Sequence, residues 1–210
     1  MNQLNNFGII PFTRGALTQM LREYSSPNDK ISSWLENGDI ISLKKGLYIV
    51  SEQYRTEKLN LEIIANQIYG PSYVSLDSAL QFYGIIPEKV SVVTSVCTKR
   101  SKSFENEIGI FSYYGVKEQY AGIGVDTKSK DGKHYFLIAT LEKALCDKII
   151  FTKNLQLKSL KAVHRFLEDD LRTDFSGIEK FNLNIIKQCE ECGIKSKELT
   201  LLEKYLQNIK

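Results

Sequence analysis

Two short fragments in the middle of the chain carry residue types suited to metal-dependent chemistry. The D-x-K fragments at 126–128 and 131–133 combine a carboxylate with a lysine, as nucleases do around a divalent ion. Both fragments lie in a segment rich in Lys, Gly, Ser and Asp, which is typical of a solvated turn between strands. Because no second acid can be placed beside Asp126 or Asp131, we expect a turn here, with no catalytic residues and no enzymatic activity.

A C-x-x-C pair near the C-terminus suggests zinc or thiol chemistry. Cys189 and Cys192 have the spacing of such sites, but only Cys97, Cys146 and two histidines remain to complete a ligand set. Apolar residues precede the pair at helical spacing, which places both sulfurs on the buried stripe of one helix. We therefore expect a structural role for these cysteines, and neither a metal nor a cofactor in the protein.

Two basic clusters are suited to contacts with phosphate. Lys44 and Lys45 lie at the tip of a predicted β-hairpin, where each ammonium group can displace a counterion condensed on DNA. Lys99, Arg100 and Lys102 form the densest basic cluster, in a predicted loop between two strands. This second cluster is a candidate additional contact for nucleic acid or a partner, although a solvated loop accounts for it equally well.

The first 55 residues are predicted to form a separate domain that positions the first cluster. The expected elements are a short helix at 3–7, a helix at 13–21, a helix at 28–37 after the N-cap Ser26, and a hairpin at 40–50. This order is typical of a winged helix-turn-helix. Such a unit lays its last helix in the major groove of DNA while the hairpin contacts neighbouring phosphates.

The exposed face of the helix at 28–37 would supply the contacts to bases. Its lysine, serine and asparagine side chains can hydrogen-bond bases or phosphates, whereas two acidic side chains on the same face would be repelled by them. The predicted DNA-binding residues are Lys30, Ser32, Ser33, Asn37, Lys44 and Lys45.

Residues 56–210 are predicted to form a second, mixed α/β domain with a helical tail from about residue 152. The expected elements are a helix at 58–69, a two-turn helix capped by Ser75, strands at 91–96, 104–114 and 135–139, and a helix at 141–151 capped by Thr140. The fold class is therefore α+β, with an N-terminal winged helix-turn-helix, a mixed α/β body and a C-terminal helical tail.

The composition describes a folded chain with little net charge. Among 210 residues, 28 Lys and Arg stand against 25 Asp and Glu, for a formal charge of +3. A nucleic-acid binder would therefore depend on local clusters of basic residues. The polar N-terminus is unlike a signal peptide, and no apolar run reaches the roughly 18 residues of a membrane span. We expect a cytoplasmic protein with no membrane contact.

Several segments together resemble the AbiEi-type antitoxin family. They are residues 45–48, 73–76, 78–80, 83–87, 94–96, 98–100, 138–140, 142–145, Asp147 and 170–172, followed by an all-helical tail. The resemblance spans nearly the whole chain and is specific only in combination. The chain departs from the family at Leu141, where Pro often begins the helix, and Leu is itself a good helix former.

The resemblance implies an antitoxin of a bacterial type IV toxin–antitoxin system, which acts in phage defence by abortive infection. Family members repress their own promoter by binding inverted repeats through an N-terminal winged helix. Their C-terminal domain counteracts a nucleotidyltransferase-like toxin and needs no stable complex with it. The implied partners are therefore promoter DNA and such a toxin, in an assembly whose number of chains is left open.

Two other classes of protein remain open from the residues themselves. A winged helix can dock on a partner protein without binding DNA. A metal-dependent enzyme acting on nucleic acid would instead use Asp126 or Asp131.

Overall fold

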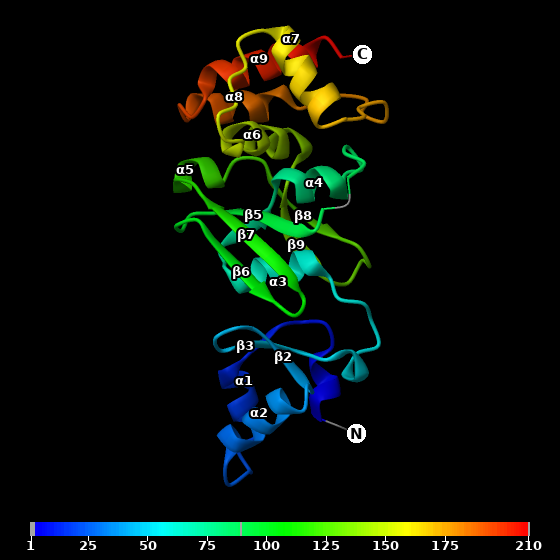
Figure 1. Ribbon diagram of the computed structural model, residues 1–210, viewed down its shortest axis with the longest axis vertical. Coiled ribbons are helices and arrows are strands. Elements are labelled where there is room, and N and C mark those ends of the chain that lie inside the picture. The colour runs from blue at the N-terminus through cyan, green and yellow to red at the C-terminus, as the bar shows by residue number, and fades with distance from the viewer. Residues whose placement is uncertain (1–2, 89, 210) are drawn as a thin grey trace.

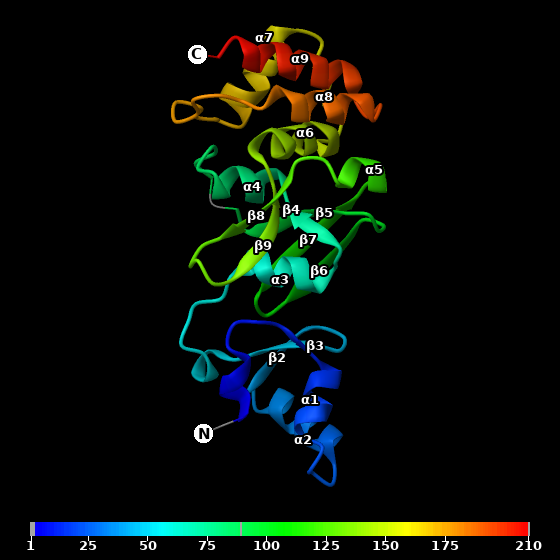
Figure 2. The same cartoon turned by 180° about the vertical axis from the view of Figure 1, so that it is seen from behind.

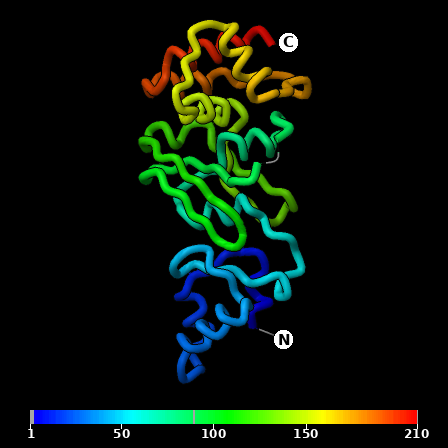
Figure 3. Tube along the Cα trace, in the orientation of Figure 1, coloured from blue at the N-terminus to red at the C-terminus, as the bar shows by residue number. Residues whose placement is uncertain are grey.

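The protein is an elongated molecule whose chain runs from one end to the other (Figures 1 and 3). The computed structural model describes residues 3–88 and 90–209. An N-terminal unit (residues 3–54) lies at one end, the body (residues 61–151) with a six-stranded sheet lies in the middle, and the tail (residues 152–209) covers the other end. The fold is therefore mixed α and β, in agreement with the predicted class.

The N-terminal unit folds around one small core. Its elements are η1 (Gln3–Phe7), β1 (Phe12–Thr13), α1 (Arg14–Met20), α2 (Pro27–Glu36), β2 (Ile40–Lys44), β3 (Leu47–Val50) and η2 (Glu52–Tyr54). Ile31 and Trp34 of α2 are buried against Tyr48 of β3. Thr13 begins α1 as predicted, since its hydroxyl accepts the N–H of Ala16 at 3.3 Å.

The predicted hairpin is present and forms part of a three-stranded antiparallel sheet. The strand order is β1-β3-β2, and the β2–β3 pairing shifts register between Ser42 and Lys44. Gly46 closes the turn at a φ of +79°, where glycine carries no steric penalty.

The body is built on a six-stranded sheet of order β6-β7-β5-β4-β9-β8. Its elements are α3 (Leu61–Ile68), β4 (Ser72–Val74), α4 (Leu76–Phe82), β5 (Val92–Cys97), β6 (Lys102–Asn106), β7 (Gly109–Gly115), α5 (Glu118–Ala121), β8 (Val125–Ser129), β9 (Tyr135–Ala139) and α6 (Leu141–Phe151). The β5–β7 and β4–β9 pairs are parallel, and the other pairs are antiparallel. Helix α3 lies toward the N-terminal unit, whereas α4 and α6 lie toward the tail (Figures 1 and 2).

The prediction of one strand over 104–114 is wrong, because the chain turns back within it. Strands β6 and β7 form a hairpin, and the Asn106 Oδ1 atom accepts the N–H groups of Ile108 at 2.9 Å and Gly109 at 3.3 Å. An asparagine side chain that bonds the backbone two or three residues ahead stabilises a turn. The alternating residues on both sides of Asn106 hide this turn in the sequence.

The predicted capping of α4 by Ser75 is also wrong in its chemistry. Ser75 precedes the helix, but its hydroxyl donates a 2.6 Å hydrogen bond to Asp147. The N–H of Ser78 in the first turn of α4 is instead accepted by the Thr94 hydroxyl of β5, at 3.3 Å. A side chain of the neighbouring strand β5 therefore accepts the free N–H group that, from the local sequence, Ser75 would be expected to accept.

A buried ion pair on α6 joins three segments of the body. Lys143 and Asp147 lie one turn apart with fully buried side chains, and Lys143 Nζ is 3.0 Å from Asp147 Oδ1. Asp147 also accepts the Ser75 hydroxyl and, at 2.7 Å, the Tyr120 hydroxyl. Lys143 Nζ donates to the Tyr120 carbonyl at 3.3 Å and lies 3.1 Å from the centroid of its ring. Burial and the Asp147 carboxylate raise the pKa of Tyr120 far above its usual range, so this hydroxyl keeps its proton.

The tail is helical, as predicted, and packs on α6. Its elements are α7 (Leu160–His164), the π-helical turn η3 (Arg165–Asp170), α8 (Leu183–Glu191) and α9 (Ser196–Gln207). Lys195 Nζ donates to the carbonyl oxygens of Ile149 at 2.8 Å and Thr152 at 3.0 Å, which fixes the α8–α9 connection to the C-terminal end of α6. Across the described residues, every helix falls short of the length and apolar character that a membrane span requires.

Replacement of Asp147 tests the buried ion pair. We expect Asp147→Asn to lower the free energy of unfolding by about 3–5 kcal/mol, because it leaves the Lys143 ammonium buried without its counter-ion. The half-buried pair of Lys148 and Asp77 is the control, and Asp77→Asn is expected to cost less than about 1 kcal/mol. Urea denaturation followed by circular dichroism measures both values. Equal losses in the two variants would show that the buried pair on α6 contributes no more to the free energy of unfolding than the half-buried pair does.

Candidate nucleic-acid interface

The solvent side of α2 carries the residues predicted to contact bases. Ser32 and Asn37 are exposed, Lys30 and Ser33 are partly exposed, and Trp34, one turn after Lys30, is buried. Lys30 Nζ lies 5.3 Å from the centroid of the Trp34 ring, and Asn37 Nδ2 donates to Ser33 Oγ at 3.4 Å. Lys30, Ser33 and Asn37 follow one another at helical spacing and therefore form one row of polar side chains.

One further basic residue, outside the predicted contacts, lies beside the start of α2. Arg14, at the start of α1, is exposed and its Nη2 donates to Asn28 Oδ1 of α2 at 2.8 Å. The bond holds the guanidinium group near the N-terminal turn of α2. Nothing in the local sequence marks Arg14, because its nearness to α2 depends on how the two helices pack.

The two lysines of the β2–β3 turn have different surroundings. Lys45 is exposed at the tip, as predicted. Lys44 is partly buried, and its Nζ donates to the carbonyl oxygen of Ile68 at 2.5 Å, at the C-terminal end of α3. The last carbonyl groups of a helix carry partial negative charge and lack partners within the helix, so they attract a cation. Lys44 therefore faces the body.

The structure brings this hairpin and the basic loop of the body together. Lys99 Nζ donates to the Gly70 carbonyl and lies 5.1 Å from the Tyr69 ring centroid, while Lys102 Nζ lies 4.8 Å from the Phe104 ring centroid. Partial burial, followed by repulsion from Lys99 and Lys102, lowers the pKa of Lys44. We call Lys44, Lys99 and Lys102 the basic seam, because they belong to two units of the chain and meet beside the end of α3.

Apolar packing holds the hairpin in this position. Leu43, Leu47 and Ile49 are buried in the same hydrophobic cluster as the residues of the body. Asn106 Nδ2 in the β6–β7 turn donates to the Leu43 carbonyl at 3.0 Å. The basic seam is therefore a product of the folded contact between the hairpin and the body, with exposed Lys45 and Arg100 beside it in sequence.

The residues considered for enzyme and thiol chemistry are engaged in local contacts. Asp126 pairs with Lys128 of its own strand at 2.7 Å, and hydrogen bonds from that lysine and from a backbone N–H lower the pKa of this carboxyl. Asp131 lies in the predicted turn between β8 and β9. Cys189 is buried as predicted, whereas Cys192 is only partly buried.

The chain matches no model of a known protein family and no curated protein in comparisons with them. The function is therefore inferred from the residues and their arrangement.

The basic seam is expected to bind multivalent anions. Millimolar tripolyphosphate should raise the melting temperature of the protein by about 3 °C or more, since a ligand that binds only the folded state stabilises it. We expect Lys99→Ala/Lys102→Ala to remove most of this rise, and the matched control Lys158→Ala/Lys161→Ala, in exposed lysines of the tail, to retain it. Differential scanning fluorimetry at constant ionic strength makes the comparison. An equal rise in both double variants would contradict binding at the seam.

Proposed function

We propose that this protein is the antitoxin and transcriptional autorepressor of a type IV toxin–antitoxin system. The observation that carries the DNA-binding part is the solvent-facing row of polar side chains on α2, followed directly by an antiparallel hairpin with exposed Lys45 at its turn. The order of α1, α2 and the hairpin supports a winged helix-turn-helix in residues 1–55. The resemblance to AbiEi-type antitoxins supports the same assignment.

In this proposal α2 lies in the major groove of promoter DNA. Lys30, Ser32, Ser33 and Asn37 contact base edges and adjacent phosphates, and Lys45 contacts the phosphate backbone. Lys99, Arg100 and Lys102 extend the positive surface toward the body. The small net charge of +3 gives weak general attraction to DNA, so repression would depend on two copies bound to an inverted repeat.

The antitoxin activity is proposed for residues 56–210. The toxin would be a nucleotidyltransferase-like protein of the cytoplasm, and the antitoxin would oppose its effect without a stable complex. Several segments of the resemblance, among them Tyr73–Leu76 and Glu142–Leu145, are buried in the body and support a shared fold. A surface that acts against the toxin must therefore use exposed residues, of which the basic loop with Arg100 is the first candidate.

The salt dependence of operator binding tests the DNA part of the proposal. Wild-type protein is expected to shift a fragment of its own upstream region, with an affinity that falls as salt rises. Lys45→Ala should flatten the slope of log K against log salt by about 0.9, the value of one phosphate contact. Lys44→Ala should flatten it less, because its ammonium group is already held by the Ile68 carbonyl. Lys204→Ala, at an exposed residue of the tail, should leave the slope unchanged.

Fluorescence anisotropy across a salt series gives these slopes. If the upstream region gives no salt-sensitive shift while a stoichiometric complex with the toxin forms, the N-terminal unit is a protein-docking module and the DNA proposal fails.

Co-expression with the toxin tests the antitoxin part. The full chain should restore growth of cells that express a nucleotidyltransferase-like protein encoded beside it. Residues 56–210 should do so too, provided that circular dichroism shows this fragment to be folded. Arg100→Ala is expected to weaken the rescue, with Lys204→Ala as the matched control. Failure of the folded full chain to restore growth would contradict the antitoxin assignment.

A further inference from the structure

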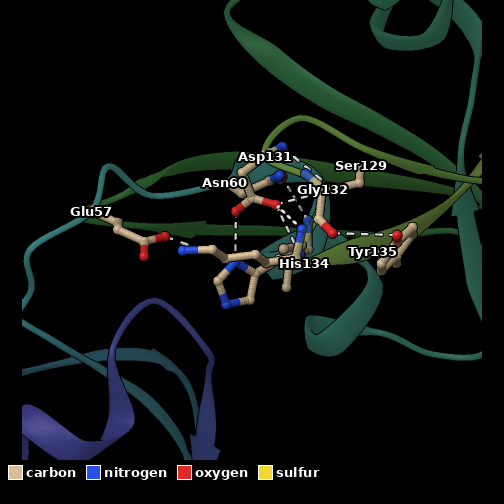
Figure 4. Close-up of polar contacts among 9 residues, drawn as sticks. Glu57, Asn60, Ser129, Asp131, Gly132, His134 and Tyr135 are labelled. Atoms are coloured by element: carbon tan, nitrogen blue, oxygen red, sulfur yellow. Dashed lines mark hydrogen bonds and ion pairs between the residues drawn. The ribbon is translucent and has the colours of Figure 1, made fainter.

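The turn between β8 and β9 places a histidine and a carboxylate beside a second carboxylate from a distant part of the chain (Figure 4). His134 Nδ1 lies 2.6 Å from Asp131 Oδ2 of the same turn and 3.8 Å from Glu57 Oε2, in the segment that leads from the N-terminal unit to the body. The three side chains each offer one donor atom, and these atoms lie within 4.8 Å of one another. We infer that Glu57, Asp131 and His134 bind a divalent transition-metal ion of the zinc and cobalt class.

The donor set selects this class of ion. Zinc is bound by imidazole nitrogen at about 2.0–2.1 Å and by carboxylate oxygen at about 2.0–2.2 Å, and it accepts three protein ligands with a water in the fourth position. Ligand atoms around such a tetrahedral ion lie about 3.3 Å apart. The 2.6 Å and 3.8 Å separations at His134 bracket this value, and all three donors lie within 4.8 Å of one another, so rotation of the exposed carboxylate side chains can bring them into range. Calcium and magnesium prefer oxygen ligands alone, and the imidazole disfavours them.

One ligand is already held in position by its own hydrogen bonds. Asp131 Oδ1 accepts the backbone N–H groups of Lys133 and His134 at 2.8 Å each, and it lies 3.0 Å from the Ser129 hydroxyl that donates to it. These bonds orient the carboxylate and leave Oδ2 directed at the imidazole. Hydrogen-bonded carboxylates of this kind are typical of metal ligands, because the outer contacts fix the donor atom.

The open side of the cluster has room for a water ligand. Glu57 and His134 also line a hollow of about 270 Å³, together with residues 5–10 of the N-terminal unit. An ion at this position would join the segment after the N-terminal unit to the body, about 74 residues further along the chain. The inference rests on these contacts alone and is independent of the proposed function.

A protonated imidazole between two carboxylates is the competing explanation of the same contacts. Metal binding by the folded chain, and its loss when a proposed ligand is replaced, separates the two explanations.

The full chain, stripped of metal, is titrated with cobalt chloride and with zinc chloride at pH 8. We expect one ion per chain, weak visible absorption bands of cobalt in a nitrogen and oxygen environment, and a rise in melting temperature with zinc. Glu57→Gln should weaken the binding more than tenfold and abolish the thermal rise. Because the Glu57 side chain is exposed, this variant should fold normally, as circular dichroism will verify.

Two matched variants serve as controls. Glu52→Gln changes an exposed acid at the end of the N-terminal unit, five residues before Glu57, and His164→Asn removes the second of the chain's two histidines. Both should bind cobalt like the wild type, whereas His134→Asn should not. The inference is overturned if no ion binds at pH 8, if Glu57→Gln and His134→Asn bind like the wild type, or if cobalt shows the intense thiolate charge-transfer band of a cysteine site.

Discussion

The buried ion pair between Lys143 and Asp147 is the contact on which the body depends. Both charges are out of contact with water, and an unpaired charge in such a place costs several kcal/mol. Asp147 is compensated only when Ser75 and Tyr120 also arrive, and they come from the segments before α4 and in α5. These segments must therefore assemble together in one register, which excludes loosely packed alternatives.

The close packing around Lys143 also restricts which residue can occupy the segment that passes over α6. Gly124 connects α5 to β8 at a φ of +58°, and a Cβ atom there would lie 2.9 Å from the Lys143 Cβ and 2.8 Å from Ile185 of α8. Only glycine fits between the ion pair's helix and the tail. On the other side, Lys195 binds the last carbonyl groups of α6. The tail is thus positioned by the helix that carries the ion pair, and the stacked order of body and tail follows from it.

Short sequence patterns predict helix caps and turns well in this chain, but they do not predict hydrogen bonds between segments that are far apart in sequence. The caps at Thr13 and Thr140 and the glycine turn of the hairpin are confirmed, because each depends on residues within one turn of the chain. Ser26 precedes α2 as predicted, but its side chain makes no capping hydrogen bond. The hydroxyl of Ser75 is taken by Asp147 and α4 is capped by Thr94, which no local rule reveals. The strand expected at 104–114 is two strands, and β4 and β8 are too short or too polar to show a strand pattern.

At the candidate site, too, some features follow from local sequence and others depend on contacts between distant segments. The polar face of α2 follows from helical spacing, whereas the direction of Lys44 does not. A turn with two lysines predicts two solvated ammonium groups, and the structure turns one of them toward the end of α3. Lys99 and Lys102 lie more than 50 residues beyond Lys44 in sequence, and the three lysines meet because Leu43 packs against the body.

Repulsion among the like charges of the basic seam opposes the contact between the hairpin and the body. Lys44, Lys99 and Lys102 repel one another, and the lowered pKa of Lys44 reports this repulsion together with burial. The carbonyl groups of Ile68 and Gly70 offset it only in part, since they carry partial charges. A bound polyanion would remove the remaining repulsion, so the proposed nucleic-acid contact and the stability of the hairpin against the body are coupled. Binding at the seam would then stiffen the junction between the two units and fix the orientation of α2. A repressor needs such a fixed orientation to hold two recognition helices on an inverted repeat.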